Sequence, residues 1–135
     1  MTWLLDTNAC IEYLRAKGGS PIADHLADRN PDEVALCSVV RAELVFGALR
    51  SRDAAANLAK VHEFVSRFVS LPFDDDAAEV YGQVRAALVG QGITIGPNDL
   101  LIASIARSCD LTLVTHNVAE FNRVPGLKTE DWETG

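Results

Sequence analysis

The feature that most constrains the fold is a short apolar run near the start of the chain that ends at an acid. Trp3, Leu4 and Leu5 form this run, and Asp6 follows it directly. Such a run is typical of a buried strand in a parallel sheet whose two faces are both covered. Open parallel sheets bind ligands at the carboxyl ends of their strands, so Asp6 lies where a site is expected. Asp6 is also a good N-cap for a helix from about Ala9, and this stretch alone favours neither role.

Short apolar segments alternate with helical segments along the rest of the chain. Further strands are predicted at residues 34–38, 69–72, 111–115 and 126–130, and helices at 9–16, 20–28, 39–50, 53–68, 77–89, 97–106 and 118–121. The first helix is expected to end at Lys17-Gly18-Gly19, and Ser38 is expected to cap the third. The alternation predicts an α/β fold with a central, mostly parallel sheet of four to five strands and helices on both faces. Residues 1–135 are expected to form a single domain, with the apolar segment 100–106 buried at its centre.

The charge and the reactive residues narrow the class of function. A net charge of −7 argues against a domain that coats nucleic acid by general electrostatics. It does not exclude a nuclease, because an active site that holds divalent metal is itself acidic. Three cysteines and three histidines are scattered, which argues against a disulfide framework and a zinc site. No apolar stretch approaches the ~18 residues of a membrane span, so we expect a reduced, soluble, cytoplasmic protein.

Polar side chains recur at the places where a parallel sheet collects them. Glu43 lies in an apolar helix after the second strand, Asp99 opens the buried helix, and Asn117 follows the strand at 111–115. These places lie at one edge of the sheet, so the side chains can meet Asp6 there. Each acid also has a structural explanation, since Glu43 fits an exposed helix stripe and Asp99 suits a helix start. Oxygen ligands select Mg²⁺ or Mn²⁺, which favours metal-assisted hydrolysis of a phosphodiester.

Four segments of the chain together match a known pattern. They are LLDTN at 4–8, SVVRAEL at 38–44, NDLLIA at 98–103 and VTHNVAEF at 114–121. In this order and spacing they resemble the PIN-domain ribonucleases, specifically the VapC-type toxins of toxin–antitoxin pairs. The resemblance covers nearly the whole chain. It implies a PIN-like fold, an endoribonuclease that uses Mg²⁺ or Mn²⁺, an RNA substrate, a VapB-like antitoxin as partner, and a homodimer.

The resemblance also implies which side chains form the site. By motif, Asp6, Glu43 and Asp99 correspond to the three metal-binding acids of the family. Asn117 falls at a fourth position where many members have Asp, and a neutral amide there puts a second metal ion in question. Glu120 can compensate from one helical turn away, although a surface role is favoured for it.

The expected mechanism divides the work among these residues. Asp6 and Asp99 hold the metal, while Glu43 binds it or orients the attacking water. Hydrogen bonds to the metal ligands or the substrate are expected from Thr7, Ser38, Thr115 and Asn117. Helix capping is the structural alternative for the hydroxyl groups.

Two other classes of function remain to be weighed against the nuclease. A phosphatase of the haloacid dehalogenase type needs a second Asp two residues after the first, where this chain has Asn8. A catalytically inactive PIN-like binding module needs only an acidic pocket that receives basic side chains of a partner. RNA cleavage by the isolated protein separates this binding module from the nuclease.

Overall fold

Five short parallel strands form the centre of the molecule, in the order β3-β2-β1-β4-β5. The computed structural model describes residues 1–16 and 19–134. The strands are β1 (Trp3–Leu5), β2 (Val34–Cys37), β3 (Val69–Leu71), β4 (Thr112–Val114) and β5 (Lys128–Glu130). Every pairing is parallel, so the predicted sheet is confirmed with five strands.

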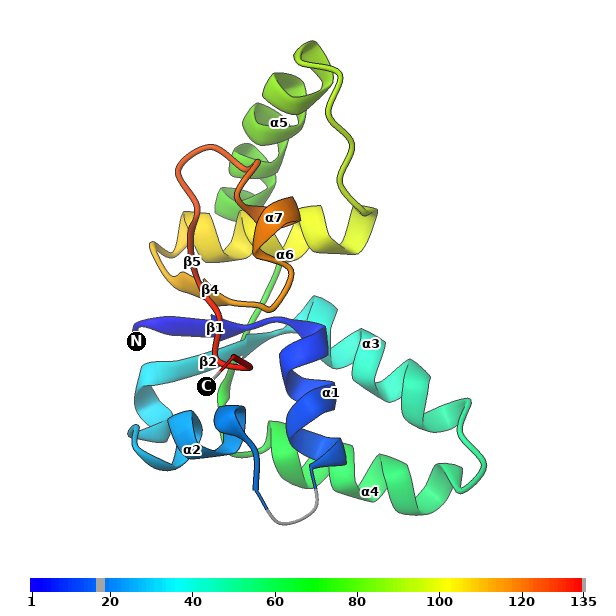
Figure 1. The fold of residues 1–135 in the computed structure, drawn as a ribbon. Helices are drawn as coiled ribbons and strands as arrows, with labels where there is room; N and C mark the ends of the chain where they lie inside the picture. The colour runs from blue at the N-terminus through cyan, green and yellow to red at the C-terminus, as the bar shows by residue number, and fades with distance from the viewer. Residues whose placement is uncertain (17–18, 135) are drawn as a thin grey trace.

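Helices cover both faces of this sheet (Figure 1). They are α1 (Thr7–Arg15), α2 (Pro21–Ala27), α3 (Ser38–Leu49), α4 (Ala54–Val65), α5 (Asp75–Gly90), α6 (Pro97–Ser108) and α7 (Val118–Phe121), with a 3-10 turn at Pro31–Glu33. In Figure 1, α5 and α6 lie on one side of the strands, and α1, α2 and α4 lie on the other. The helices predicted from the sequence are therefore present, with small shifts at their ends.

Two helix ends predicted from the sequence are the start of α3 and the end of α1. The expected cap by Ser38 is wrong: the backbone is already helical at Ser38, so Cys37 holds the cap position without a side-chain hydrogen bond. The expected glycine stop of the first helix involves Lys17 and Gly18, which lie outside the described residues. Within the described part, α1 ends at Arg15.

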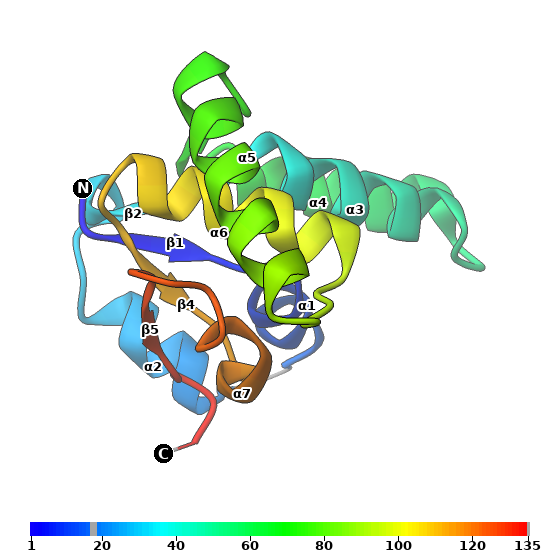
Figure 2. The same cartoon turned by 90° about the horizontal axis from the view of Figure 1, so that it is seen from above.

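The order of the strands defines where a ligand would bind. The chain runs outward from β1 through β2 to β3, and then returns to the other side of β1 to add β4 and β5. The direction of winding thus reverses between β1 and β4, and Figure 2 shows these two strands from above. In open parallel sheets, ligands bind in the crevice at the carboxyl ends of the strands beside such a reversal. Asp6 follows β1 at this position, and Thr115 follows β4.

Helix α6 carries the largest share of the core beside the sheet. Its residues Ile102, Ala103, Ile105 and Ala106 are fully buried, which confirms the central position expected from its apolar sequence. Because this helix runs back toward β4, its N-terminal end lies near the carboxyl edge of the sheet, together with Asp99. Cys10, Cys37 and Cys109 are free thiols. None of the helices in the described ranges has the length and hydropathy needed to cross a bilayer.

Candidate active site

Asp6 is the N-cap of α1 and lies where the sequence also predicts a site. Its carboxylate is only 4% exposed, and Oδ1 accepts a hydrogen bond from the backbone N–H of Ala9 at 2.7 Å, as the N-cap of α1. The side chain of Thr115, at the end of β4, lies near this carboxyl group. Burial raises the pKa of Asp6, and nearby Glu43 adds to the effect, whereas the polar groups of Thr115 and Ala9 oppose it. A buried acid therefore sits at the reversal of the sheet.

Glu43 reaches the same region from α3 and is held there by Thr7. The Thr7 hydroxyl donates to Oε1 of Glu43 at 2.8 Å, which links the first turn of α1 to α3. Glu43 is half-buried rather than part of a fully solvated stripe. The hydroxyl of Thr7 thus orients an acid and does not cap the helix, whose cap is Asp6.

Asp99 is the third residue of α6 and is half-buried. Its pKa is raised to about 6, first by burial and then by the negative charges of Glu120, Asp6 and Glu43. A depression of about 230 Å³ opens between Asp99 and Glu43, and the start of α6 forms its remaining wall. The predicted convergence of Asp6, Glu43 and Asp99 is therefore supported by their mutual electrostatic influence.

Glu120 lies beside this cluster, and both of its hydrogen bonds are at the exposed surface. Oε1 accepts from the backbone N–H of Gly96 at 3.1 Å, and Oε2 accepts from the side-chain amide of Asn117. These bonds tie α7 to the start of α6 and place a carboxylate near Asp99. The signal in the sequence is the spacing of three residues, which puts Asn117, the N-cap of α7, on the same side of the chain as Glu120 in the first turn.

The remaining predicted residues lie at different distances from the acids. Asn117 is exposed, and its backbone N–H donates to the Thr115 hydroxyl at 3.0 Å, while its amide reaches Glu120. Thr115 is fully buried and helps to lower the pKa of Asp6. Ser38 is exposed at the first turn of α3, and no contact with the acids supports its predicted role.

The donor set of this pocket fits a hard divalent cation. All its charged groups are carboxylates, which are the ligands that hard divalent cations prefer, and their negative charges add to burial in raising the pKa of Asp99. Among the described residues, only His116, Asp131 and Glu133 bring three His, Cys, Asp or Glu ligand atoms within 4.8 Å of one another. The acids of the pocket do not all come this close together. This spacing suits an ion such as Mg²⁺, which keeps several of its water ligands.

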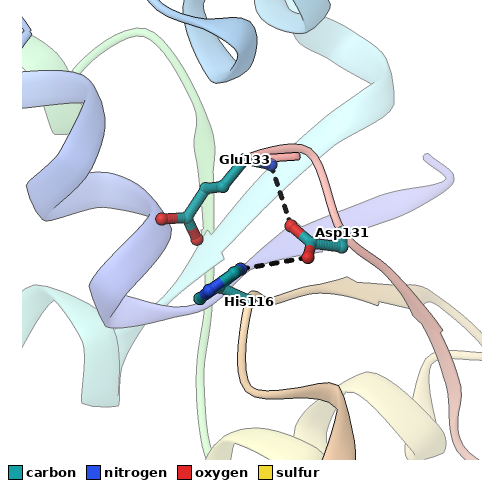
Figure 3. A group of neighbouring side chains, drawn as sticks. All are labelled: His116, Asp131 and Glu133. Atoms are coloured by element: carbon teal, nitrogen blue, oxygen red, sulfur yellow. Dashed lines mark hydrogen bonds and ion pairs between the residues drawn. The ribbon is translucent and has the colours of Figure 1, made fainter. Parts of the chain in front are cut away.

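The trio of His116, Asp131 and Glu133 is a feature that sequence reasoning missed (Figure 3). Nδ1 of His116 lies 3.0 Å from Oδ2 of Asp131, and the backbone N–H of Glu133 donates to Oδ1 of Asp131 at 2.9 Å. The spacing of Cys and His residues in the sequence gives no sign of this trio, because two of its members are acids. The available signal is a histidine directly after one strand and an Asp-x-Glu directly after the next.

Comparisons with known proteins agree with the fold. Residues 3–127 match the PIN domain family. The chain is 42% identical over 132 residues to the tRNA(fMet)-specific endonuclease VapC of Shigella flexneri, with 98% of each chain aligned. It is 36% identical over 133 residues to Ribonuclease VapC2 of Rickettsia felis, covering 98% of this chain and 99% of the relative.

Solved structures give the same assignment. The chain is similar to one in the crystal structure of DNA-bound VapBC from Salmonella typhimurium, with a TM-score of 0.92, 38% identity and 98% of each chain covered. A chain of VapBC2 from Rickettsia felis, bound to a promoter DNA fragment, gives a TM-score of 0.89 at 37% identity, with coverages of 98% and 99%. The resemblance seen in the sequence is confirmed, and the chain belongs to the PIN-domain family and, within it, to the VapC group.

Proposed function

We propose that this protein is a VapC-type endoribonuclease that requires Mg²⁺, or Mn²⁺ in its place, and acts as the toxin of a toxin–antitoxin pair. The observation that carries the proposal is the carboxylate cluster around Asp99, whose pKa is raised to about 6. It lies at the edge of the sheet where parallel α/β folds bind ligands. The similarity of the whole chain to named endonucleases supports the same assignment.

In the proposed mechanism, Asp6 and Asp99 hold the divalent ion and Glu43 orients the attacking water. When bound, the ion supplies Lewis acidity, which lowers the pKa of water and stabilises charge on phosphoryl oxygen. The hydrogen bond from Thr7 keeps the Glu43 carboxylate turned toward the pocket. Attack of the water oxygen on phosphorus forms one P–O bond, the ester P–O bond breaks, and the leaving oxygen takes a proton.

In this proposal, the fourth position of the site is an amide, Asn117, instead of a carboxylate. Asn117 has no charge, but its amide bonds to Glu120, and the charge of Glu120 acts on Asp99. Glu120 thereby supplies the negative charge that Asn117 lacks. Thr115 fixes Asp6, and Ser38, exposed at the start of α3, is available to hydrogen-bond an RNA substrate.

The relatives suggest the substrate and the partner to test first. Two similar proteins, at 42% and 38% identity, are named tRNA(fMet)-specific endonucleases, so we propose this tRNA as the first candidate substrate. Similar chains occur in VapBC complexes, so we propose a VapB-like antitoxin as the inhibitor. A homodimer, as the family resemblance implies, is also proposed.

The test is cleavage of RNA by the purified protein, free of antitoxin, with and without Mg²⁺ or Mn²⁺. We expect the wild type to cleave and EDTA to stop it. Asp99→Asn should abolish cleavage while the far-UV circular dichroism spectrum stays unchanged. Asp75→Asn is the matched control, because Asp75 also lies in the first turn of a helix but in α5.

The outcomes separate the nuclease from the binding module. Unchanged cleavage by Asp99→Asn would show that the acidic pocket is not the active site. If the wild type cleaves no RNA with either metal, and both proteins bind the antitoxin equally, the pocket is a docking site for basic side chains.

A further inference from the structure

A second group of potential metal ligands lies where the chain leaves β4 and β5. His116 follows β4, and Asp131 and Glu133 follow β5, so three ligand atoms from neighbouring strands come within 4.8 Å of one another. Figure 3 shows the three side chains directed into a common space. One imidazole nitrogen and two carboxylates form this set, which differs in chemistry from the all-carboxylate pocket around Asp99.

The oxygen atoms of Glu133 provide a separate observation that points to a cation. Oε2 of Glu133 is shielded from solvent and has no hydrogen-bond partner among the described residues. Asp6, Glu12 and Asp131 add negative charge around this carboxylate. A shielded carboxylate oxygen without a donor is costly, and the cost is removed when a cation takes the lone pair.

The ion pair of His116 with Asp131 does not by itself account for this arrangement. The His116 side chain is 61% exposed, and exposed pairs of this kind contribute little to stability. The pair also leaves Oε2 of Glu133 without a partner. The backbone N–H of Glu133 holds Oδ1 of Asp131, so Oδ2, which now pairs with Nδ1 of His116, is the oxygen that would ligate an ion once that pair opens.

We propose that His116, Asp131 and Glu133 form a second cation site, which binds Zn²⁺ or a similar transition-metal ion. Imidazole with carboxylates suits zinc, whereas Mg²⁺ prefers oxygen ligands alone. Three protein ligands leave at least one coordination position for water. The exposed His116 ring rotates to bring its nitrogen to the ion in place of the hydrogen bond to Asp131.

A bound ion would tie together segments that are otherwise connected by few side chains. It would join the turn that carries Asn117 to the segment after β5. Because the ligands are dispersed in the unfolded chain, binding to the folded form raises the melting temperature. This inference does not depend on RNA cleavage.

The test is zinc binding to the metal-free full chain, measured by isothermal titration calorimetry in the presence of excess Mg²⁺. Co²⁺ replaces Zn²⁺ in a second titration, so that the visible absorption bands report ligand replacement. We expect Asp99→Asn to bind one Zn²⁺ as tightly as the wild type. His116→Gln should bind at least about tenfold more weakly, and should lose the thermal stabilisation by zinc.

Two further variants keep the test decisive. His62→Gln is the matched control, because His62 is an exposed histidine on α4, and it should bind zinc like the wild type. Glu133→Gln removes a ligand from the half-buried segment after β5 and serves where His116→Gln does not fold; it should also weaken binding. Equal zinc affinity of His116→Gln, Glu133→Gln and the wild type would overturn the proposal, as would loss of all zinc binding in Asp99→Asn.

Discussion

Asp99 illustrates at the scale of one residue how a half-buried carboxylate near other acids reduces the stability of the fold. Its pKa in the folded protein is about 6, above the usual 3.8, so the folded state holds this proton more tightly than the unfolded state. Stability is therefore lost as the pH rises from about 4 through 6. We expect Asp99→Asn to raise the free energy of unfolding of the metal-free protein at pH 7.5 by about 1 kcal/mol, allowing for solvent screening. Urea titrations at several pH values measure this difference.

The pH and the metal supply controls for this prediction. The difference between Asp99→Asn and the wild type should disappear below about pH 3, where the carboxyl group is largely protonated in both states. Addition of Mg²⁺ at pH 7.5 should stabilise the wild type and not the variant, since the carboxylate is then paired. A variant less stable than the wild type at pH 7.5 without metal would contradict the repulsion among these acids.

Thr7 offers a second prediction at the scale of a residue. Its hydroxyl holds Glu43 at 2.8 Å, so Thr7→Val keeps the side-chain shape and removes only this bond. We expect RNA cleavage to fall by about tenfold, because a misplaced catalytic group reduces the rate even when its chemistry is intact. Thr7→Ser should restore most of the activity, and single-turnover kinetics of both variants measure the effect. If Thr7→Val cleaves at the wild-type rate, Glu43 does not depend on this bond.

At the scale of elements, helix α3 connects the acidic pocket to an apolar groove. The groove has a volume of about 290 Å³, lies between α1, α3 and α4, and includes Glu43 in its lining. Phe46 and Leu49 on α3 are 63% and 58% exposed. Neither of these two side chains lines the groove. We expect the antitoxin to cover the exposed apolar side chains of α3, so Phe46→Asp should weaken its binding by at least about tenfold.

Surface plasmon resonance with the cognate antitoxin measures this change. Val89→Asp is the control, since Val89 is 66% exposed on a different helix, α5, and should leave the affinity unchanged. Equal affinity of Phe46→Asp and the wild type would place the antitoxin on another surface.

The sequence predicts the strands and helices well, but it does not predict the contacts between distant elements. Apolar runs and helix signals predict the parallel sheet, because burial on both faces leaves few other folds for this alternation. The positions of Asp6 and Asp99 follow from the same topology. Glu120 could not be placed reliably, since its role depends on a backbone N–H at Gly96 that is distant in sequence. The same holds for His116, whose partners lie beyond the next strand.

At the scale of the whole molecule, an aromatic cluster around Trp132 holds three segments of the chain together. Trp132 is 1% exposed, and its ring meets Trp3 edge-on at 5.6 Å and stacks on His25 at 5.1 Å. The guanidinium of Arg29 lies 4.5 Å from the centre of the same ring. The aromatic cluster therefore connects the start of β1, the α2 region and the segment after β5.

Removal of this ring should weaken the entire fold and the proposed zinc site with it. We expect Trp132→Ala to lower the free energy of unfolding by about 3 to 5 kcal/mol, and Trp132→Phe to lower it clearly less, in urea denaturation followed by circular dichroism. Asp131 and Glu133 flank Trp132 in the chain, so loss of the aromatic cluster also removes the packing that positions two of the three proposed zinc ligands. Zinc should then raise the melting temperature of Trp132→Phe but not of Trp132→Ala. Similar unfolding free energies for the two variants would mean that the chain end is held by other contacts.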